Sequence, residues 1–433
     1  MAHIGFGIPL WMCLPFLAML LSIALFPLFG SHFWEKNRNK LIIALVLSLP
    51  ILVFFFAHGG EKKVYETLVF DYLPFIILLG SLFSITGGIH LAGDMEATPL
   101  RNTAWLGIGA VLASFMGTTG AAMLLIRPVI NTIKERHYRI HTILFFIGII
   151  ANTGGLLTPL GDPPLFMMYL RGAPFTWFFR LFPEWLFVNG LLLIIYCFVD
   201  SRYYRKEPPE NIARDKASVS PLKIEGAGNF VWLLGIVLAV AFLNEQYLPF
   251  IKANPYFRFV REGAILLVAG LSYVLTKKHI RYHNRFVWAP ILEVAYLFLG
   301  IFITMVPCLL YLEIHARQLG IASINQFYYY TGFLSSFLDN TPTAVTFHSL
   351  ALGLGQQASA LAAGIPEAVL KAICLGAVFF GSMTYIGNGP NFMIKAIAEH
   401  HHMQMPHFFS YMLKFSLIVL LPVFILAQLL FVR

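Results

Sequence analysis

The sequence predicts an all-α polytopic membrane protein, and three observations support this fold class. Of its 433 residues, 58% are hydrophobic and only 12% are charged, whereas a soluble protein carries about 25% charged residues. Several apolar runs reach the roughly 20 residues that a helix needs to cross a bilayer. Two pairs of similar polar interruptions recur at nearly the same spacing. We therefore expect about ten transmembrane helices plus two re-entrant hairpins, arranged in two inverted repeats with two broken helices at the membrane midplane.

The expected spans follow the apolar runs along the chain. The run 8–29 has no charged flank and no small-residue cleavage site, so we expect a retained span rather than a signal peptide. The runs 141–170 and 367–399 are each interrupted by helix-breaking residues and are expected to be broken helices. The full set of expected spans is 8–29, 40–57, 69–91, 141–170, 175–199, 229–249, 262–276, 288–312, 367–399 and 408–431.

Two further apolar stretches are too short on either side of a polar centre to cross a membrane. "FMGTTGAAM" interrupts the stretch 104–130, and "FLDNTPTAV" interrupts the stretch 326–352. Each arm has only about 12 apolar residues, whereas a spanning helix needs roughly 20. We expect both stretches to be re-entrant hairpins that enter and leave the membrane on the same side.

The interruptions are related by an internal repeat. "LASFMGTTGAAM" (112–123) and "LSSFLDNTPTAV" (334–345) share residues such as Ser114/Ser336 and Thr119/Thr341, 222 positions apart. "GLLTPLGDPPLFM" (155–167) and "GSMTYIGNGPNFM" (381–393) share residues such as Thr158/Thr384, 226 positions apart. Two matched windows in the same order and at nearly one spacing indicate a duplicated unit.

The repeat divides the chain into two halves. We expect a first repeat at 1–205, a cytoplasmic linker at 206–225 and a second repeat at 226–433. Each half then holds five crossings, and because five is odd the second half must be inverted. With the N-terminus outside, the inner loops carry about twice as many Lys and Arg residues as the outer loops, which favours this orientation.

The stretch "ANTGGLLTPLGDPPLF" (151–166) places glycines, prolines and a carboxylate at membrane depth. Irregular backbone at that depth persists only where it is buried in protein or lines a watery cavity. Broken helices paired across inverted repeats point to the binding site of a transporter. Their carbonyl, hydroxyl and amide oxygens are the ligands that hard cations such as sodium prefer, and the N-termini of the half-helices can hold an anion.

These motifs resemble the ion-transporter superfamily, which includes sodium/dicarboxylate symporters, citrate carriers, arsenite carriers and NhaD-type sodium/proton antiporters. The resemblance covers nearly the whole chain and is most specific at 114–127, 152–166, 336–344 and 381–393. "NTGGLLTPLGDPPLF" followed by "YIGNGPNFM" looks most like the NhaD-type branch. The dicarboxylate branch carries Ser-Asn-Thr at both hairpin tips, whereas the tips here are Gly117-Thr118-Thr119 and Asp339-Asn340-Thr341.

The resemblance implies two cation sites, each formed by a hairpin tip and the neighbouring helix break. It also implies a homodimer, with the sodium ion as the coupling or transported ion and no resident cofactor. We expect a multi-pass protein of the bacterial inner membrane with lipids and small ions or a small anion as partners. Carried over, the first site is Thr118, Thr119, Asn152, Thr153, Gly155, Thr158 and Asp162, and the second is Asn340, Thr341, Thr343, Ser382, Thr384, Gly387 and Asn388, with Asp339 as a further candidate.

Two transport functions remain open at this point. The leading interpretation is sodium/proton antiport by alternating access, in which Asp162, or as second choice Asp339, binds either a proton or sodium. The alternative is a sodium- or proton-coupled carrier of an anion such as citrate, a dicarboxylate or an oxyanion. Each carboxylate is alternatively only a helix cap, since Asp162 precedes Pro163 and Asp339 lies at a tip. No motif of an intramembrane enzyme is present, so we expect a protein that is not an enzyme.

The remaining polar residues have simpler interpretations. The net charge of +9 comes from loop residues that set membrane orientation, and we expect no nucleic-acid partner. The four cysteines are far apart in apolar segments and form no disulfide or metal pattern. His90 and His348 are expected to be core or interface histidines, and "HHH" at 400–402 a solvated loop.

Overall fold

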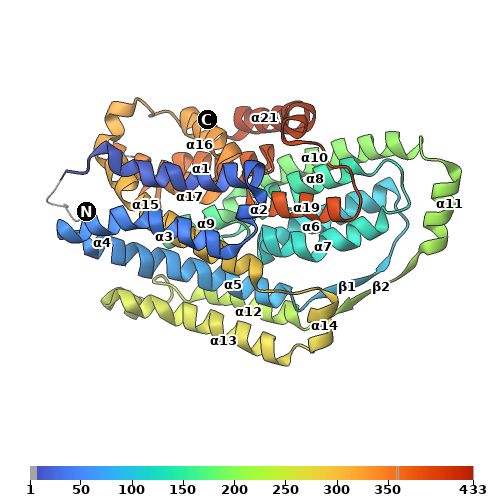
Figure 1. Cartoon of the computed structure of the whole chain (residues 1–433), viewed down its shortest axis with the longest axis horizontal. Coiled ribbons are helices and arrows are strands. Elements are labelled where there is room, and N and C mark those ends of the chain that lie inside the picture. The colour runs from blue at the N-terminus through green and yellow to red at the C-terminus, as the bar shows by residue number, and fades with distance from the viewer. Residues whose placement is uncertain (1–6, 357, 359, 433) are drawn as a thin grey trace.

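The computed structural model describes residues 7–356, 358 and 360–432. It is an elongated bundle in which most helices run along the long axis (Figure 1). Within the described residues, seven helical segments are long and apolar enough to cross a membrane. This confirms the predicted class, an all-α polytopic membrane protein. The seven segments are Leu10–Pro27, Asn37–Ala57, Glu61–Thr86, Ile140–Leu157, Phe175–Tyr204, Ala289–Leu319 and Phe408–Phe431.

Seven is fewer than the ten expected spans, because three expected spans, 229–249, 262–276 and 367–399, form helices shorter than a full crossing needs. The expected span 229–249 ends as helix α12 (Asn229–Phe242), before the polar run Asn244–Gln246. Helix α13 (Phe259–Leu275) has 17 residues, and the expected span 367–399 is divided into two short helices. The other helices outside the hairpins and breaks are α1 (Leu14–Phe29), α2 (Ser31–Trp34), α3 (Asn37–Ala57), α4 (Glu61–Glu66), α5 (Leu73–Thr86), α10 (Phe182–Tyr204), α15 (Ala289–His315), α20 (Phe408–Tyr411) and α21 (Leu421–Phe431).

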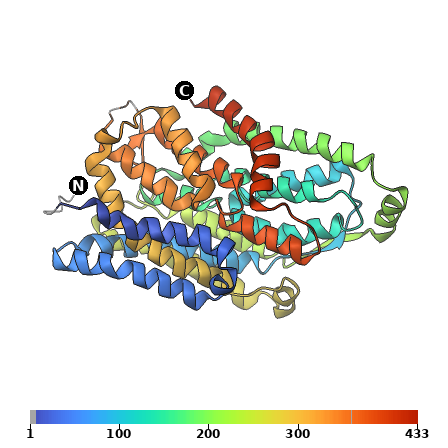
Figure 2. The ribbon, with the colours of Figure 1, turned by 45° about the horizontal axis from the view of Figure 1, so that its top comes forward.

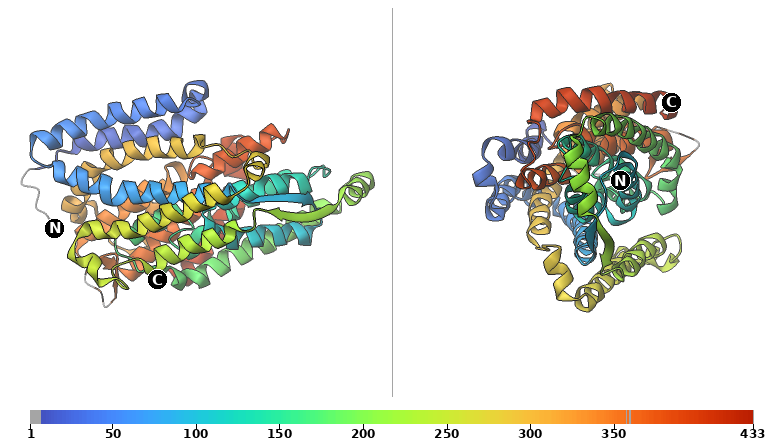
Figure 3. Two further views of the ribbon diagram at one scale, coloured as in Figure 1. Left: turned by 90° about the horizontal axis from the view of Figure 1, so that it is seen from below. Right: turned by 90° about the vertical axis from the view of Figure 1, so that its right-hand side faces the viewer.

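The outer helices expose apolar side chains, whereas the centre is densely buried. Val46 on α3, Ile194 on α10 and Val274 on α13 are 62%, 68% and 79% exposed. Apolar side chains this exposed are expected to face lipid tails. Lipid tails are as apolar as the side chains, so burying them inside the protein would bring no hydrophobic gain. Helices α1 and α3 lie side by side along one edge of the bundle (Figure 3).

Two helical hairpins lie at opposite ends of the bundle (Figure 2). Helices α6 (Pro99–Met116) and α7 (Thr118–Thr132) turn at Gly117, whose φ of 82° favours glycine. Helices α16 (Ile324–Phe337) and α17 (Asn340–Leu354) turn at Leu338 and Asp339. Both turns fall where the sequence placed them, although the arms, at 14 to 18 residues, are longer than expected. That each hairpin enters and leaves on one side of the membrane stays a prediction, as does the inverted arrangement of the halves.

Both expected broken helices are broken. Helix α8 (Ile140–Ile149) is followed by a 3₁₀ turn and then by α9 (Pro163–Leu170). Helix α18 (Glu367–Phe380) is likewise followed by a 3₁₀ turn and by α19 (Gly389–His400). Every residue from 145 to 162 is buried, so the irregular backbone lies inside protein, as its position requires. The break is also too tight for a side chain at Gly161, where a Cβ atom would lie 2.0 Å from the Gly155 carbonyl oxygen.

A two-stranded ribbon is the main feature that the sequence did not predict. Strand β1 (His90–Asp94) pairs antiparallel with β2 (Ser220–Glu225), next to helix α14 (Lys278–His283) (Figure 1). Residues 90 and 91 were expected in a span, but α5 ends at Thr86. The segment 206–225, expected as a linker, contains helix α11 (Pro209–Ser218) as well as β2. A second, very short pair joins β3 (Leu361–Ala362) to β4 (Ile365–Pro366).

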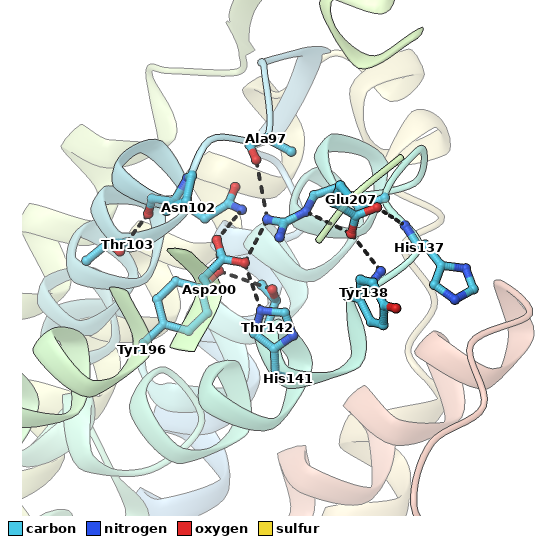
Figure 4. A network of polar contacts seen from close by, with 12 residues as sticks. Ala97, Asn102, Thr103, His137, Tyr138, His141, Thr142, Tyr196, Asp200 and Glu207 are labelled. Carbon is cyan, nitrogen blue, oxygen red and sulfur yellow. Dashed lines mark hydrogen bonds and ion pairs between the residues drawn. The ribbon is translucent and has the colours of Figure 1, made fainter. Parts of the chain in front are cut away.

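A buried ion-pair network anchors the base of the first hairpin (Figure 4). Arg136, which follows α7, lies 2.7 Å from Asp200 on α10 and 3.6 Å from Glu207. Asp200 also accepts from Asn102 on α6 at 3.1 Å and contacts His141 on α8 at 2.8 Å. Because a buried charge left without its partner costs about 3–5 kcal/mol, this network fixes α6, α8 and α10 together at that end.

Candidate functional site

Both hairpin tips and both helix breaks meet at one carboxylate, that of Asp162. Its Oδ1 accepts from the Thr118 hydroxyl at 2.9 Å. Its Oδ2 accepts from the Asn340 side-chain amide at 2.6 Å, and the Asn388 amide approaches Oδ1 at 3.5 Å. Asp162 is only 1% exposed. The carboxylate therefore joins the first hairpin, the second hairpin and the second break.

This arrangement decides against Asp162 as a simple helix cap. The side chain makes no capping hydrogen bond to the first turn of α9. Instead both oxygens form hydrogen bonds with side chains on other elements, Thr118 at the first tip and Asn340 at the second. An ionisable side chain at this depth is costly, so it is usually either paired with an opposite charge or functional. Each partner of Asp162 here is neutral, which favours a function.

Asp339 behaves differently and is a helix cap. Its Oδ1 accepts from the backbone N–H of Thr341 at 3.0 Å, at the start of α17. The hydroxyl of Thr343 donates to the Asp339 carbonyl at 2.9 Å. These bonds stay within one turn of α17, so Asp339 and Thr343 stabilise the second tip.

Each half contains an equivalent hydrogen bond between its hairpin and its helix break. The Thr158 hydroxyl donates to the Ser114 carbonyl at the end of α6. The Thr384 hydroxyl donates to the Ser336 carbonyl at the end of α16. These are the residue pairs that the repeated sequence windows matched, so equivalent residues make equivalent contacts in both halves.

A cavity of about 100 Å³ lies against both tips. Leu82 on α5 and Phe298 on α15 contribute to its apolar wall. The polar side is built from both hairpin tips and from the second break. Of the residues predicted as ligands, those that line the cavity are Thr118, Thr119, Asp339, Asn340, Thr341 and Asn388.

Four helices begin at this cavity. The first residues of α7, α9, α17 and α19 all line it. The N-terminus of a helix carries a partial positive charge and unpaired N–H groups, which favour an anion. Backbone donors are few here, because the Thr118 N–H already donates to the Gly161 carbonyl and α9 begins with two prolines. The site can therefore bind negative charge mainly through the helix dipoles and the side-chain amides, while Asp162 beside it can hold a cation or a proton.

The other predicted residues lie behind the cavity and shape it. Thr153 donates to Asn189 on α10 at 2.7 Å, and Ser382 donates to the Phe379 carbonyl at 2.5 Å. A Cβ atom at Gly155 would come within 2.6 Å of Thr118, and one at Gly387 within 2.6 Å of the Ser335 carbonyl. These four residues, with Thr158 and Thr384, hold the breaks in shape and do not line the cavity.

Asn391 is a central residue that the sequence reasoning missed. Its side chain accepts from Asn152 at 2.8 Å and donates to the carbonyls of Gly381 and Thr384 at 2.8 and 2.9 Å. Asn152 in turn accepts from Asn388 at 3.1 Å. The three amides thus link one break to the other. The signal available was an amide side chain in the first turn of the half-helix that follows the second break.

Comparison with known proteins agrees with a membrane carrier. A "46 kDa membrane protein" of Mycobacterium leprae (strain TN) is 26% identical over 423 residues, which cover 88% of this chain and 90% of that protein. "Inner membrane protein YbiR" of Escherichia coli (strain K12) is 26% identical over 134 residues, 28% of this chain and 36% of that protein. A family model described as "Putative citrate transport" matches residues 5–432. Because that match spans nearly the whole chain, the protein belongs to this family of membrane transporters.

Proposed function

We propose that the protein is a secondary active transporter of a citrate-like carboxylate anion, coupled to sodium ions or protons. The observation that carries this proposal is the convergence of four helix N-termini on one cavity. The description of the family favours the same reading. Of the two functions that the sequence left open, the anion carrier is therefore the better supported.

The donors around the cavity suit carboxylate groups. The side-chain amides of Asn340 and Asn388 and the hydroxyls of Thr119 and Thr341 come from both halves. At about 100 Å³ the cavity has room for roughly three water molecules, which is less than a tricarboxylate occupies. We propose that the substrate enters when the tips separate from α5 and α15, as one half moves against the other.

The carboxylate of Asp162 offers a physical reason why binding of a cation and binding of the anionic substrate would be coupled. An ionised carboxylate beside the cavity repels an anionic substrate, and two charges about 4 Å apart at an effective dielectric of 20 interact by roughly 4 kcal/mol. A sodium ion or proton on Asp162 removes that repulsion. Binding of the cation and binding of the anion then favour each other, which is the reciprocity that a symporter needs.

A basic groove supports an anionic substrate as well. It has a volume of about 340 Å³ and lies at the base of the first hairpin. A groove lined by one sign of charge raises the local concentration of ions of the opposite sign. The residues that line it include Arg127, Lys134, Arg139, Arg285 and His400, His401 and His402.

Sodium/proton antiport remains the second candidate, because of one asymmetry. The repeat places the carboxylate of Asp162 opposite the neutral amide of Asn388, and the two side chains approach to 3.5 Å. A single group that holds either sodium or a proton, but never both, is sufficient for exchange. Antiport needs no organic solute, so an experiment without one distinguishes it from transport of an anion.

Proteoliposomes that contain the purified protein test the two functions against each other. Labelled citrate should accumulate inside when an inward sodium or proton gradient is imposed, and unlabelled citrate or another tricarboxylate should compete. Sodium-driven collapse of a pH gradient without any organic solute would instead establish antiport. Uptake that ignores both gradients would contradict secondary active transport.

We also propose a location and an assembly. The printed name of the Escherichia coli relative and the apolar outer helices support the bacterial inner membrane, with lipids around the bundle. The homodimer implied by the family resemblance is tested by the molar mass of the purified protein in detergent micelles. A monomeric mass at all protein concentrations would contradict the homodimer.

A further inference from the structure

Three potential metal ligands from different segments lie together next to the ribbon. His90 begins β1, Glu225 ends β2 and His283 ends α14. Their ligand atoms all lie within 4.8 Å of one another, and His283 Nδ1 is 3.5 Å from Glu225 Oε2. The group is remote from Asp162 in the chain, and none of its members lines the tip cavity.

The ribbon and a clamp on the backbone fix this geometry. His90 and Glu225 are direct partners in the antiparallel register, so their side chains leave the same face. Asn284, the residue after His283, donates to the carbonyl of Ile89, the residue before His90, at 3.0 Å. The two histidines are therefore held near each other by a bond between their immediate neighbours, before any ion binds.

One ligand atom is buried without a hydrogen bond. Among the described residues, no donor forms a hydrogen bond with Glu225 Oε2, although this atom is inaccessible to solvent. Lys223 reaches only the other oxygen, at 3.7 Å. The nearest donor to Oε2 is His283 Nδ1, at 3.5 Å, which is long for a hydrogen bond. An ion between this oxygen and the two imidazoles would satisfy it better.

The chemistry of the three side chains selects the ion. The neutral imidazole of histidine is a common metal ligand. Two imidazoles and one carboxylate match the ligands of zinc sites that keep a fourth position open. Alkaline-earth ions prefer sets of oxygen ligands instead.

We propose that His90, Glu225 and His283 bind a divalent transition-metal ion of the zinc class, with one position left for water or a small ligand. The bound ion ties β1, in the first half, to β2 and α14 in the linker and the second half. It is a structural or regulatory site, separate from the tip cavity and independent of which substrate the protein carries.

The test starts from tag-free protein in which His400, His401 and His402 are changed to alanine, since three consecutive exposed histidines bind metals weakly. Zinc competition against a chromophoric chelator should then give one ion per chain. Cobalt(II) should give visible bands typical of four or five ligands. Loss of an outer partner of a metal ligand already costs 10–100-fold in affinity, so His90→Ala, Glu225→Gln and His283→Ala should each weaken zinc binding by about 100-fold or more.

A matched control separates this site from general histidine binding. His279 lies on the same helix, with its ring 5.8 Å from that of His283, but outside the group of three. His279→Ala should keep the affinity, and His283→Cys should keep it too while adding a thiolate-to-cobalt band that His279→Cys lacks. Elution of each variant as a single folded peak is the check on folding. No zinc binding in the parent, or equal losses in His279→Ala and His90→Ala, would overturn the proposal.

Discussion

The two halves of the central site use the same scaffold but different charges. In both, a threonine of the helix break donates to a serine carbonyl at the end of the first arm of the hairpin. At the next equivalent position, however, the first half has the carboxylate of Asp162 and the second has the amide of Asn388. The second tip also has an acidic residue, Asp339, but its carboxylate caps helix α17.

This difference separates residues that build the site from residues that give it function. A contact that recurs in both halves is structural, because each half needs it to hold its hairpin tip against its helix break. A charge found in only one half cannot be required by the scaffold, since the other half folds without it. We therefore expect Asp162 to be the residue through which transport is driven.

The largest effect is expected at Asp162. Asp162→Asn keeps the size of the side chain but removes the charge. The new amide can turn its oxygen toward Asn340 and its NH2 group toward the Thr118 hydroxyl, which can accept. Loss of the charge removes coupling, so gradient-driven uptake in proteoliposomes should be abolished. The protein should still elute as a folded species.

Exchange of the two residues sharpens this test. The variant Asp162→Asn/Asn388→Asp restores one carboxylate in the mirrored half-site. Partial recovery of uptake would show that the halves are interchangeable around one charge. Wild-type uptake in Asp162→Asn alone, with an unchanged dependence on sodium and pH, would contradict the role of Asp162.

The next effect concerns the glycines of the two breaks. A Cβ atom at Gly161 would lie 2.0 Å from a carbonyl oxygen, whereas one at Gly387 would lie 2.6 Å from its nearest atom. Overpacking costs about 1–3 kcal/mol, so Gly161→Ala should lower the midpoint of thermal unfolding in detergent more than Gly387→Ala. Gly190→Ala on α10, where the new Cβ atom meets nothing within 4 Å, should leave the midpoint unchanged or raise it. A smaller effect at Gly161 than at Gly387 would contradict the close approach in the first break.

A smaller effect is expected at Asp339. Asp339→Ala removes a cap, which costs about 1 kcal/mol, but leaves the bonds of Asp162 intact. The thermal midpoint should fall by a few degrees while uptake continues. Loss of uptake at full stability would show that Asp339 takes part in transport and is more than a cap.

The smallest effect is expected at the paired tip threonines. The Thr119 hydroxyl forms no hydrogen bond within the described residues, and that of Thr341 contacts Asn340 at 3.4 Å and interacts with Asp339. Both residues line the cavity, so Thr119→Ala and Thr341→Ala should each raise the sodium concentration needed for half-maximal uptake by about 5-fold, as for one lost ligand of roughly 1 kcal/mol. An unchanged sodium requirement in both variants would exclude coordination by the tips.

The sequence predicted the helices and turns that depend on local chemistry. Gly117 and Asp339 mark the two hairpin turns because glycine tolerates a positive φ and aspartate caps a helix. The two breaks could be predicted because prolines and glycines inside an apolar run interrupt a transmembrane helix. The cavity residues at both tips followed from the same pattern and from the family resemblance.

The features that the sequence missed depend on pairing between distant segments. The ribbon joins residues 90–94 to residues 220–225. Strand β1 has no alternating apolar pattern, and the alternation in β2 covers only the four residues from Leu222 to Glu225. Asn391 lay opposite Leu165 in the repeat, so the repeat gave no reason to select it. The network of Arg136, Asp200 and Glu207 combines residues that separately read as ordinary loop charges.

That network has a mechanical consequence. It holds the base of the first hairpin, while the tip, at the far end of the 15-residue helix α7, is roughly 22 Å away at 1.5 Å per residue. With the base fixed, a tilt of about 5° would displace the tip by roughly 2 Å over that length. A displacement of this size is enough to break the 2.9 Å bond from Thr118 to Asp162. With Arg136 as a pivot, a slight rotation of the hairpin would be enough to open or close the site.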